Sequence, residues 1–251
     1  MILISHKPKT AGTAFRVYVQ DNVGPRLAAY YQEIEHNHPA FRFEDCSDPD
    51  RLRRAAETSG AQIIQSHQIG PFLKAFPGAP VFCCIRDPLK RTISSYLHLQ
   101  QKDSGQFSEM AFTTFVRGAG LPYTSLVQEA RGAGSPLALF PYERIDEAID
   151  TLNTGAGWKG RLQLRNLSTH AEEAKAAEIL SRVSPEVTAL LAPEQDIFDR
   201  LIADWDGGPA RADFLAIARR MPPRYRGFSL SRLRYAYLNL RYMARPDRRK
   251  G

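Results

Sequence analysis

The sequence predicts an α/β protein built around a central, mainly parallel sheet. Four short apolar runs are typical of buried strands, and amphipathic stretches of helical length lie between them. Strands that alternate with helices along a chain favour parallel pairing through right-handed crossovers. A chain of 251 residues can also bury a substantial core as one α/β domain.

The predicted strands are short apolar runs bounded by turn residues. They lie at 2–5, 62–66, 81–85 and 137–141, with a weaker candidate at 161–164. The predicted helices carry apolar residues at helical spacing. They lie at 14–23, 49–58, 88–101, 110–117, 123–130 and 143–153.

The last part of the chain is predicted to be helical and basic. Residues 171–205 follow a helical pattern, with a break expected near Pro193 because proline disrupts a helix interior. Residues 206–209, Asp-Gly-Gly-Pro, are typical of a linker. We therefore expect a first domain at 1–205 and a basic helical C-terminal extension at 206–251.

The composition favours an anionic partner. The formal net charge of +7 suits a phosphorylated ligand, an acidic glycan, a nucleic acid or a membrane surface. Three cysteines do not make a disulfide framework, so we expect the adjacent Cys83 and Cys84 to be small core residues. No apolar run is long enough to span a membrane, and the first strand starts at residue 2, so the sequence predicts a soluble, cytoplasmic protein.

The stretch after the first strand is the most informative part of the sequence. An apolar run, a tight basic turn and a helix start follow one another, and the turn consists of Pro8, Lys9, Thr10, Ala11, Gly12 and Thr13. Backbone N–H groups at a helix start point at a ligand, and the helix dipole favours negative charge there. Lys9 adds a positive charge, the two threonines add hydroxyl donors, and Gly12 lets the backbone approach closely. The sequence therefore predicts a site for a phosphate-like group.

A second candidate anion site follows the strand predicted at 81–85. Arg86 stands at the carboxyl end of that strand, where open α/β sheets bind ligands. Asp87 is a suitable N-cap, and Pro88 suits the first helical position. Ser94 lies about two turns into the helix, so Arg86 and Ser94 together suit a second phosphate.

These two segments resemble those of the PAPS-dependent sulfotransferases, where PAPS is 3′-phosphoadenosine 5′-phosphosulfate. The first is similar to the 5′-phosphosulfate loop His-x-Pro-Lys-Thr-Gly/Ala-Gly-Thr of the carbohydrate group, which includes heparan- and chondroitin-type and bacterial enzymes. It runs from His6 to Thr13, with Lys7 in place of the usual apolar residue. The second segment is similar to the family's 3′-phosphate motif, Arg-Asp-Pro-x-x-Arg-x-x-Ser-x-Tyr. Its matching residues are Arg86, Asp87, Pro88, Arg91, Ser94 and Tyr96.

The resemblance implies a P-loop-like three-layer fold and transfer of a sulfuryl group from PAPS, which leaves PAP (3′-phosphoadenosine 5′-phosphate). Residues 8–13 would hold the 5′-phosphate, and Lys9 would stabilise negative charge on the leaving oxygen, so that no metal is required. Arg86 and Ser94 would hold the 3′-phosphate. The expected acceptor is a hydroxyl of a carbohydrate or glycolipid.

His67 is the candidate catalytic base. It follows the strand predicted at 62–66, so we expect it at the same edge of the sheet as Lys9 and Arg86. A histidine of near-neutral pKa can take a proton from an acceptor hydroxyl. Ser66-His67 also resembles the Gly-His segment in which carbohydrate sulfotransferases place their base. The alternative is a strand-end histidine that bonds to backbone.

Asn166 and Ser168 are further candidates for binding the donor. Residues 165–169 resemble an Asn-x-Ser turn that lies near the nucleotide in the sulfotransferase family. A helix N-cap at Ser168 or Thr169 explains the same residues at least as well.

The C-terminal extension carries many arginines with interleaved aromatic residues. An amphipathic basic helix at 230–243 would lie on an anionic membrane, which suits a glycolipid acceptor and a peripheral location at the inner face of the membrane. A helix packed on the domain with its arginines in water is the equal alternative.

Two other classes of function compete with sulfuryl transfer. A basic nucleic-acid-binding module would use the charges and aromatic rings of the extension. It leaves the placement of Lys9, Arg86 and Ser94 after strands unexplained, so we expect no nucleic-acid partner. A P-loop-type nucleotide kinase would carry Gly-Lys-Ser/Thr and an acidic residue after its second core strand. Here that position holds Arg86, and Gly-Lys-Ser/Thr is absent from the sequence.

Overall fold

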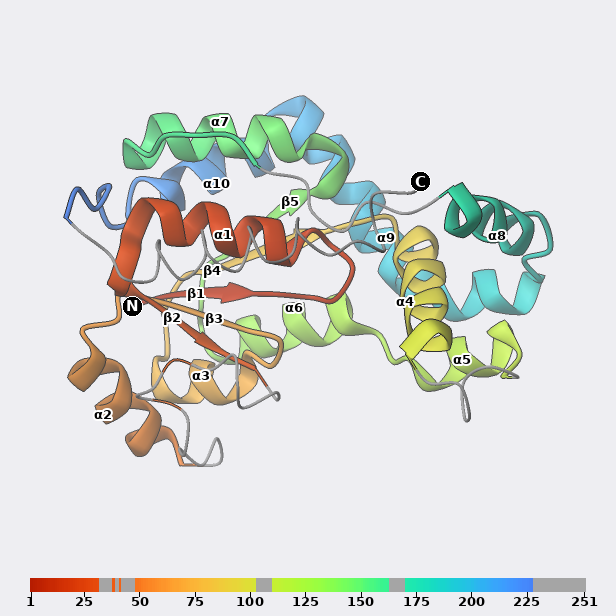
Figure 1. The fold of residues 1–251 in the computed structure, drawn as a ribbon, viewed down its shortest axis with the longest axis horizontal. Helices are drawn as coiled ribbons and strands as arrows, with labels where there is room; N and C mark the ends of the chain where they lie inside the picture. Colours follow the sequence, from red (N-terminus) through yellow and green to blue (C-terminus); the bar gives the residue numbers. More distant parts are fainter. Residues whose placement is uncertain (32–37, 39–40, 42–47, 103–109, 163–169, 228–251) are drawn as a thin grey trace, which may run out of the picture.

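The centre of the protein is a five-stranded parallel sheet with the strand order β2-β3-β1-β4-β5 (Figure 1). The computed structural model describes residues 1–31, 38, 41, 48–102, 110–162 and 170–227. The strands are β1 Ile2–Ser5, β2 Leu27–Tyr30, β3 Ile63–Ser66, β4 Val81–Ile85 and β5 Leu137–Pro141. The predicted α/β class with a mainly parallel sheet is confirmed.

Helices connect and cover the strands. They are α1 Gly12–Val23, α2 Pro49–Ser59, α3 Gly70–Ala75, α4 Pro88–Lys102, α5 Phe112–Gly118, α6 Pro122–Gly132, α7 Ile145–Ala156, α8 His170–Ser181, α9 Pro185–Gly207 and α10 Pro209–Ala218. Short 3₁₀ helices span Gly24–Arg26 and Tyr142–Arg144. The helices predicted at 14–23, 49–58, 88–101, 110–117, 123–130 and 143–153 each match one of these within three residues at either end.

Alternation of side chains along the strands builds two cores. Ile2 and Ile4 lie in the core under α1, α7 and α10, whereas Leu3 lies in the core under α2, α3 and α6. Successive strand residues point to opposite faces, so a continuous apolar run serves both cores. Figure 1 shows α7, α10 and α1 above the sheet and α6, α3 and α2 below it. The result is the predicted three-layer arrangement of helices, sheet and helices.

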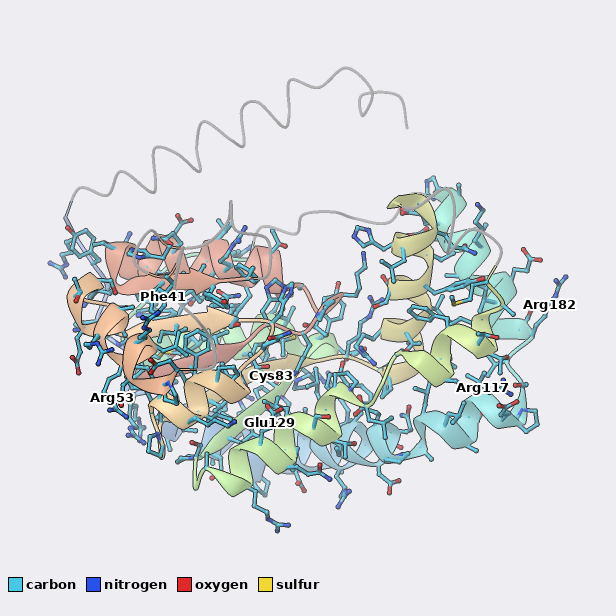
Figure 2. All side chains as sticks on the ribbon, turned by 90° about the horizontal axis from the view of Figure 1, so that it is seen from below. Phe41, Arg53, Cys83, Arg117, Glu129 and Arg182 are labelled. Carbon is cyan, nitrogen blue, oxygen red and sulfur yellow. The ribbon has the colours of Figure 1, made fainter. Side chains whose placement is uncertain are left out.

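The adjacent cysteines of β4 belong to these two cores. Cys83 is fully buried in the interior (Figure 2), and its neighbour Cys84 faces the opposite core. Burial raises the pKa of Cys83 to about 11 and raises that of Cys84 well above its ordinary value, so both thiols stay neutral. They are core residues, as predicted.

β1 is the point at which the chain switches sides of the sheet. After β1 the chain covers one face with α1, and after β3 and β4 it covers the other face with α3 and α6. In open α/β sheets a crevice for ligands forms outside the carboxyl ends of strands at such a switch point. The topology therefore predicts a ligand-binding crevice beyond the carboxyl ends of β1, β3 and β4.

The edge strand β2 was not predicted from the sequence. Its residues, Leu-Ala-Ala-Tyr, include two alanines, which are depleted in strands. β2 forms because it pairs in parallel with β3, from Leu27 opposite Ile63 to Tyr30 opposite Ser66. The weaker strand predicted at 161–164 is absent from residues 161 and 162, and the rest of it lies outside the described residues.

The helix break predicted near Pro193 is wrong. The break lies at residues 182–184 between α8 and α9, and the Ser184 Oγ accepts a hydrogen bond from Val187 N at 3.3 Å as the N-cap of α9. α9 continues through Pro193. Leu191 and Glu194, on either side of the proline, are both buried, so tertiary packing holds the helix together where local sequence would interrupt it.

The linker predicted at 206–209 is a tight turn between two helices. α9 ends at Gly207, Gly208 adopts a left-handed φ of 101°, and Pro209 begins α10. Phe214 of α10 is fully buried and its ring contacts the rings of three core residues, Phe82, Phe140 and Trp205. The first part of the predicted extension therefore packs into the core of the sheet, and residues 228–251 lie outside the described part of the chain.

The segment after α10 is fastened beside the C-terminal end of α1. Trp158 Nε1 donates to the carbonyl of Pro222 at 2.8 Å, and Tyr225 N donates to the carbonyl of Asn22 at 2.6 Å. The ring of Tyr225 occupies the space where a side chain at Gly24 would lie. Because α1 runs back from the end of β1, this anchor lies at the opposite edge of the sheet from the loop at residues 8–13.

Loss of the Phe214 ring tests whether α10 belongs to the core. Phe214→Ala should lower the free energy of unfolding by about 3–5 kcal/mol, because it leaves a cavity among aromatic rings. Leu180→Ala is the matched control, because Leu180 is 47% exposed and its loss should cost at most about 0.5 kcal/mol. Urea unfolding measures both values, and equal costs for the two variants would show that α10 is dispensable to the core.

Candidate functional site

The residues that directly follow the strands line one edge of the sheet. Parallel strands all end at the same edge, and the N-terminal ends of α1 and α4 lie there too. Across the sheet, from β2 to β5, these residues are Tyr31, His67, His6, Arg86 and Tyr142. The edge therefore carries two histidines, an arginine and two phenols. We refer to it below as the carboxyl edge.

The loop after β1 holds its backbone in an uncommon conformation. Lys9 and Ala11 have positive φ angles of 67° and 56°, and they are the non-glycine residues of the described chain that do so. The left-handed region costs a non-glycine residue about 1–2 kcal/mol. Strain of this kind concentrates at functional sites, and turns of this kind gather N–H groups into concave anion-binding nests.

The start of α1 leaves backbone donors available at this loop. Ala11 is the N-cap residue and makes no side-chain capping bond, and the first turn has no acidic residue. The Thr10 hydroxyl donates to the carbonyl of Lys7 at 2.7 Å and so braces the loop from inside. Thr10 thus offers an anion its backbone N–H. Free N–H groups and an unopposed helix dipole favour an anion at this point.

Gly12 is required by its contact with His6. A side chain at Gly12 would place its Cβ 1.6 Å from Cδ2 of the His6 ring, which no packing tolerates. The Gly12 carbonyl also accepts a long hydrogen bond of 3.4 Å from the buried Gln65 Nε2 of β3. The imidazole therefore fills the place that Gly12 leaves empty, and the helix start is held against β1 and β3.

His6, Tyr31 and His67 form an edge-to-face cluster of rings. The ring centroids of His6 and His67 lie 4.6 Å apart, and those of Tyr31 and His67 lie 4.7 Å apart. His6 Nδ1 and the Tyr31 hydroxyl share a hydrogen bond of 3.0 Å. Burial, followed by the nearby His67 and Arg16, lowers the pKa of His6 to about 3. His6 is therefore neutral at physiological pH, and it orients the half-buried His67.

Hydrogen bonds fix the backbone of Arg86 and leave its guanidinium at the carboxyl edge. The Tyr123 hydroxyl donates to the carbonyl of Arg86 and accepts from Arg86 N, both at 3.0 Å. The guanidinium lies over the Tyr142 ring, 4.9 Å from its centroid. Its Nε is buried and has no hydrogen-bond partner among the described residues. A buried cationic donor without a partner requires an explanation, and an anionic ligand supplies one.

The start of α4 is built as the sequence predicts. Asp87 Oδ1 accepts a hydrogen bond from Lys90 N at 2.8 Å, so Asp87 is the N-cap before Pro88. Ser94 lies about two turns further along α4 and is half-buried. Glu143, just after β5, brings a second carboxylate near Arg86, where its Oε1 accepts from Asp87 N at 3.5 Å.

The carboxyl edge brings most of the predicted site residues together. Residues 8–13, His67 and Arg86 follow the adjacent strands β1, β3 and β4, and Ser94 lies on the helix that starts beside Arg86. Asn166 and Ser168 lie outside the described residues. Their roles, and those of the other site residues, stay predictions.

Sequence reasoning missed several residues at this edge. Tyr31 follows a strand that was not predicted, and Gln65 and Tyr123 come from the interior of β3 and the start of α6. Tyr142 and Glu143 could have been predicted from the sequence, because they are the first two residues after the strand predicted at 137–141. The rule that ligands bind after parallel strands would have found those two.

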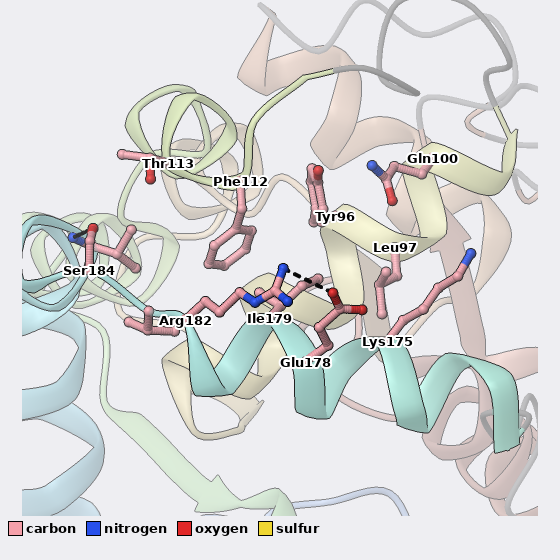
Figure 3. Close-up of a pocket in the computed structure, with 12 residues that line it drawn as sticks. Tyr96, Leu97, Gln100, Phe112, Thr113, Lys175, Glu178, Ile179, Arg182 and Ser184 are labelled. Carbon is pink, nitrogen blue, oxygen red and sulfur yellow. Dashed lines mark hydrogen bonds and ion pairs between the residues drawn. The ribbon is translucent and has the colours of Figure 1, made fainter.

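A cavity of about 380 Å³ lies away from these residues. It opens between α4, α5, α8 and the start of α9, and its lining includes Tyr96 and Phe112 with Lys175 and Arg182 at its rim (Figure 3). An exposed ion pair joins Arg182 to Glu178 at 3.0 Å. Residues 8–13, His67, Arg86 and Ser94 are not among the residues that line it, and Tyr96 is the one residue of the second sequence motif that does. The convergence of charge and hydrogen-bond donors at the carboxyl edge, rather than this cavity, identifies the candidate site.

Comparisons with known proteins give limited information. No protein-family model and no curated protein matches the chain. Among solved structures, the chain is similar to a sulfotransferase from Alicyclobacillus acidocaldarius at 14% identity and a TM-score of 0.43, over 76% of this chain and 95% of that chain. A similarity at this level carries no argument about function, which has to rest on the site itself.

Two other kinds of site have no counterpart among the described residues. Within the described ranges, no helix is long and apolar enough to cross a membrane. In the same part of the chain, no group of three or more His, Cys, Asp or Glu side chains is arranged to hold a metal ion.

A double-mutant cycle tests the contact between Gly12 and His6. Gly12→Ala alone should lower the free energy of unfolding by about 1–3 kcal/mol through overpacking. In a His6→Ala background the same change should be neutral or stabilising by about 0.5–1 kcal/mol, since alanine is the better helix former. Urea unfolding of the four proteins measures the coupling. An equal cost of Gly12→Ala in both backgrounds would contradict the contact.

Proposed function

We propose that this protein is a sulfotransferase that moves a sulfuryl group from PAPS to a hydroxyl of a carbohydrate or glycolipid. The observation that carries the proposal is the pairing of two cationic sites on adjacent strands. The strained loop of Lys9 follows β1, and Arg86, with its partnerless buried Nε, follows β4. PAP and PAPS are nucleotides with anionic groups at both the 5′ and the 3′ position, so they suit two separate anion sites.

The donor would lie across β1 and β4. Backbone N–H groups of residues 10–13 and the Lys9 amine would hold the 5′-phosphosulfate at the start of α1. Arg86 and the Ser94 hydroxyl would hold the 3′-phosphate. The ring of Tyr142, against which the Arg86 guanidinium packs, would keep that guanidinium in place. Binding energy at the 3′-phosphate would position the reacting sulfur at the loop.

The acceptor would lie on the opposite side of β1 from β4, beyond the carboxyl ends of β3 and β2. His67 and Tyr31 follow those strands, and His6 separates them from the Lys9 loop. His67 would take the proton from the acceptor hydroxyl as its oxygen attacks sulfur. His6 is too weak a base for this step at neutral pH, because its pKa is about 3.

The reaction would be an in-line displacement at sulfur. A new bond forms between the acceptor oxygen and sulfur, and the bond from sulfur to the bridging oxygen of the 5′-phosphate breaks. The acceptor proton passes to His67, and PAP leaves with the electron pair of the broken bond. Lys9 and the loop N–H groups would stabilise the charge that develops on this leaving oxygen. The chain's own donors would therefore do what a metal does in phosphoryl transfer.

The most specific part of the proposal is that the acceptor is a carbohydrate. It rests on the match of residues 6–13 to the loop of the carbohydrate group. A glycolipid acceptor would fit a basic extension on an anionic membrane, and the described anchor of that extension lies at the edge opposite the site. Peripheral binding at the inner face of a membrane stays a prediction.

Binding of PAP tests the donor. PAP should raise the melting temperature of the wild type without metal, and AMP and ADP should raise it less, because a ligand that binds the folded state stabilises it. Arg86→Ala should remove the advantage of PAP over AMP. Arg117→Ala is the control, since Arg117 is 59% exposed and paired with Glu186. An equal shift with ADP, or magnesium-dependent turnover of ATP, would favour a nucleotide kinase instead.

Replacement of Lys9 tests the chemical step. Lys9→Ala and Lys9→Gly should both lower turnover by about 10²–10³, the cost typical of losing one donor to a developing oxyanion. Lys9→Gly should keep or raise the melting temperature, since glycine adopts the φ of 67° without strain. Lys74→Ala, on the exposed side of α3, is the control. Turnover retained in Lys9→Gly would rule out the role of the amine.

A further inference from the structure

Three helices meet behind Arg86 at a buried cluster of polar groups. Arg91 comes from α4, Tyr123 from the start of α6 and Glu194 from the middle of α9. The side chains of Arg91 and Glu194 are 7% and 0% exposed. Buried charges are costly unless they are paired and hydrogen-bonded. The contacts of Arg91 and Glu194 therefore show which parts of the chain this cluster holds in place.

Glu194 holds the first turn of α6. Its Oε1 accepts hydrogen bonds from Tyr123 N and Thr124 N, both at 2.8 Å. Thus a carboxylate from another helix does the work of an N-cap and complements the α6 dipole. Arg91 lies 3.9 Å from the other oxygen of Glu194, and its guanidinium is 5.1 Å from the Tyr123 ring centroid.

Tyr123 links the start of α6 to the backbone of Arg86. Its ring is fully buried between Arg91 and the core, and its hydroxyl is the partner of both the N–H and the carbonyl of Arg86. Arg86 is the first residue beyond β4, so its backbone is held by this one phenol where the sheet pairing ends. Burial is the main cause of the raised pKa of Tyr123, which keeps the phenol protonated as a donor.

We propose that Tyr123 and Glu194 are positioning residues for the anion site at Arg86. Glu194 fixes the start of α6, α6 fixes the phenol of Tyr123, and the phenol sets the direction in which Arg86 leaves the sheet. The proposal rests on the proposed function, because it assigns the 3′-phosphate of the donor to Arg86. It adds that discrimination for this phosphate depends on a hydroxyl and a carboxylate that never touch the nucleotide.

A purely structural role predicts a different outcome. Damage to the core would weaken every ligand of the carboxyl edge alike. Loss of the positioning contact would weaken only a ligand that uses Arg86, because the Lys9 loop is held by His6, Gln65 and Thr10 on the other side of β1. The ratio of the affinities for PAP and AMP separates these cases, since the two ligands differ only in the 3′-phosphate.

The experiment is a calorimetric titration of PAP and AMP into folded wild type and variants. Tyr123→Phe keeps the ring and removes the hydroxyl, and it should lower the affinity for PAP about ten-fold while leaving that for AMP unchanged. Tyr18→Phe is the matched control, because Tyr18 is also buried and its hydroxyl donates to Asn153 Oδ1 at 2.9 Å, on the face covered by α7. It should change neither affinity.

The outcomes separate this inference from the proposed function. If the wild type does not prefer PAP to AMP, the proposed function is wrong and the inference falls with it. If the wild type prefers PAP and Tyr123→Phe keeps that preference, or loses affinity for both ligands equally, only the inference is overturned. Should Tyr123→Phe fail to fold, Glu194→Gln decides. It keeps the shape and one oxygen acceptor, and it should lower the PAP-to-AMP ratio by a smaller factor.

Discussion

The common direction of the five strands is the constraint on which the rest of the structure depends. β1 pairs in parallel with both β3 and β4, so the loop of Lys9, His67 and Arg86 emerge from three neighbouring strands at one edge. Neighbouring strands lie about 4.8 Å apart, which brings the two candidate anion sites within reach of one nucleotide. Antiparallel pairing of β4 would carry Arg86 to the opposite edge and leave each site alone.

Two kinds of support hold the carboxyl edge, one on either side of β1. On the side of β3, the imidazole of His6 occupies the place of a side chain at Gly12 and packs edge-on against His67. On the side of β4, a phenol and a buried carboxylate hold the backbone of Arg86. Conformations as strained as those of Lys9 and Ala11 persist only where the surroundings over-determine them. The contacts with His6 and Gln65 on the side of β3 meet that condition for the loop.

The parts of the fold that could be predicted from the sequence are those that local pattern dictates. The strands at 2–5, 81–85 and 137–141 match the structure residue for residue, because each is a short, mainly apolar run; β1 and β4 are buried on both faces, and the edge strand β5 is buried on one face and half-buried on the other. β2, with its two alanines, exists only through pairing with β3. α9 runs through Pro193 because the residues around it are buried. Local propensity gave the wrong answer at both places, because long-range contacts outweigh it.

The sequence by itself determined the chemistry of the candidate site. The order of Lys9, Gly12, His67 and Arg86 after apolar runs predicts a parallel sheet with candidate anion-binding groups at one edge, because strand ends and helix starts are local features. Only the tertiary structure decided what holds these groups in place. Tyr31 and Tyr123 reach the edge from far along the chain, and Glu194 lies more than one hundred residues after Arg86. Contacts over such separations depend on how helices pack across the sheet, which no local pattern of residues encodes.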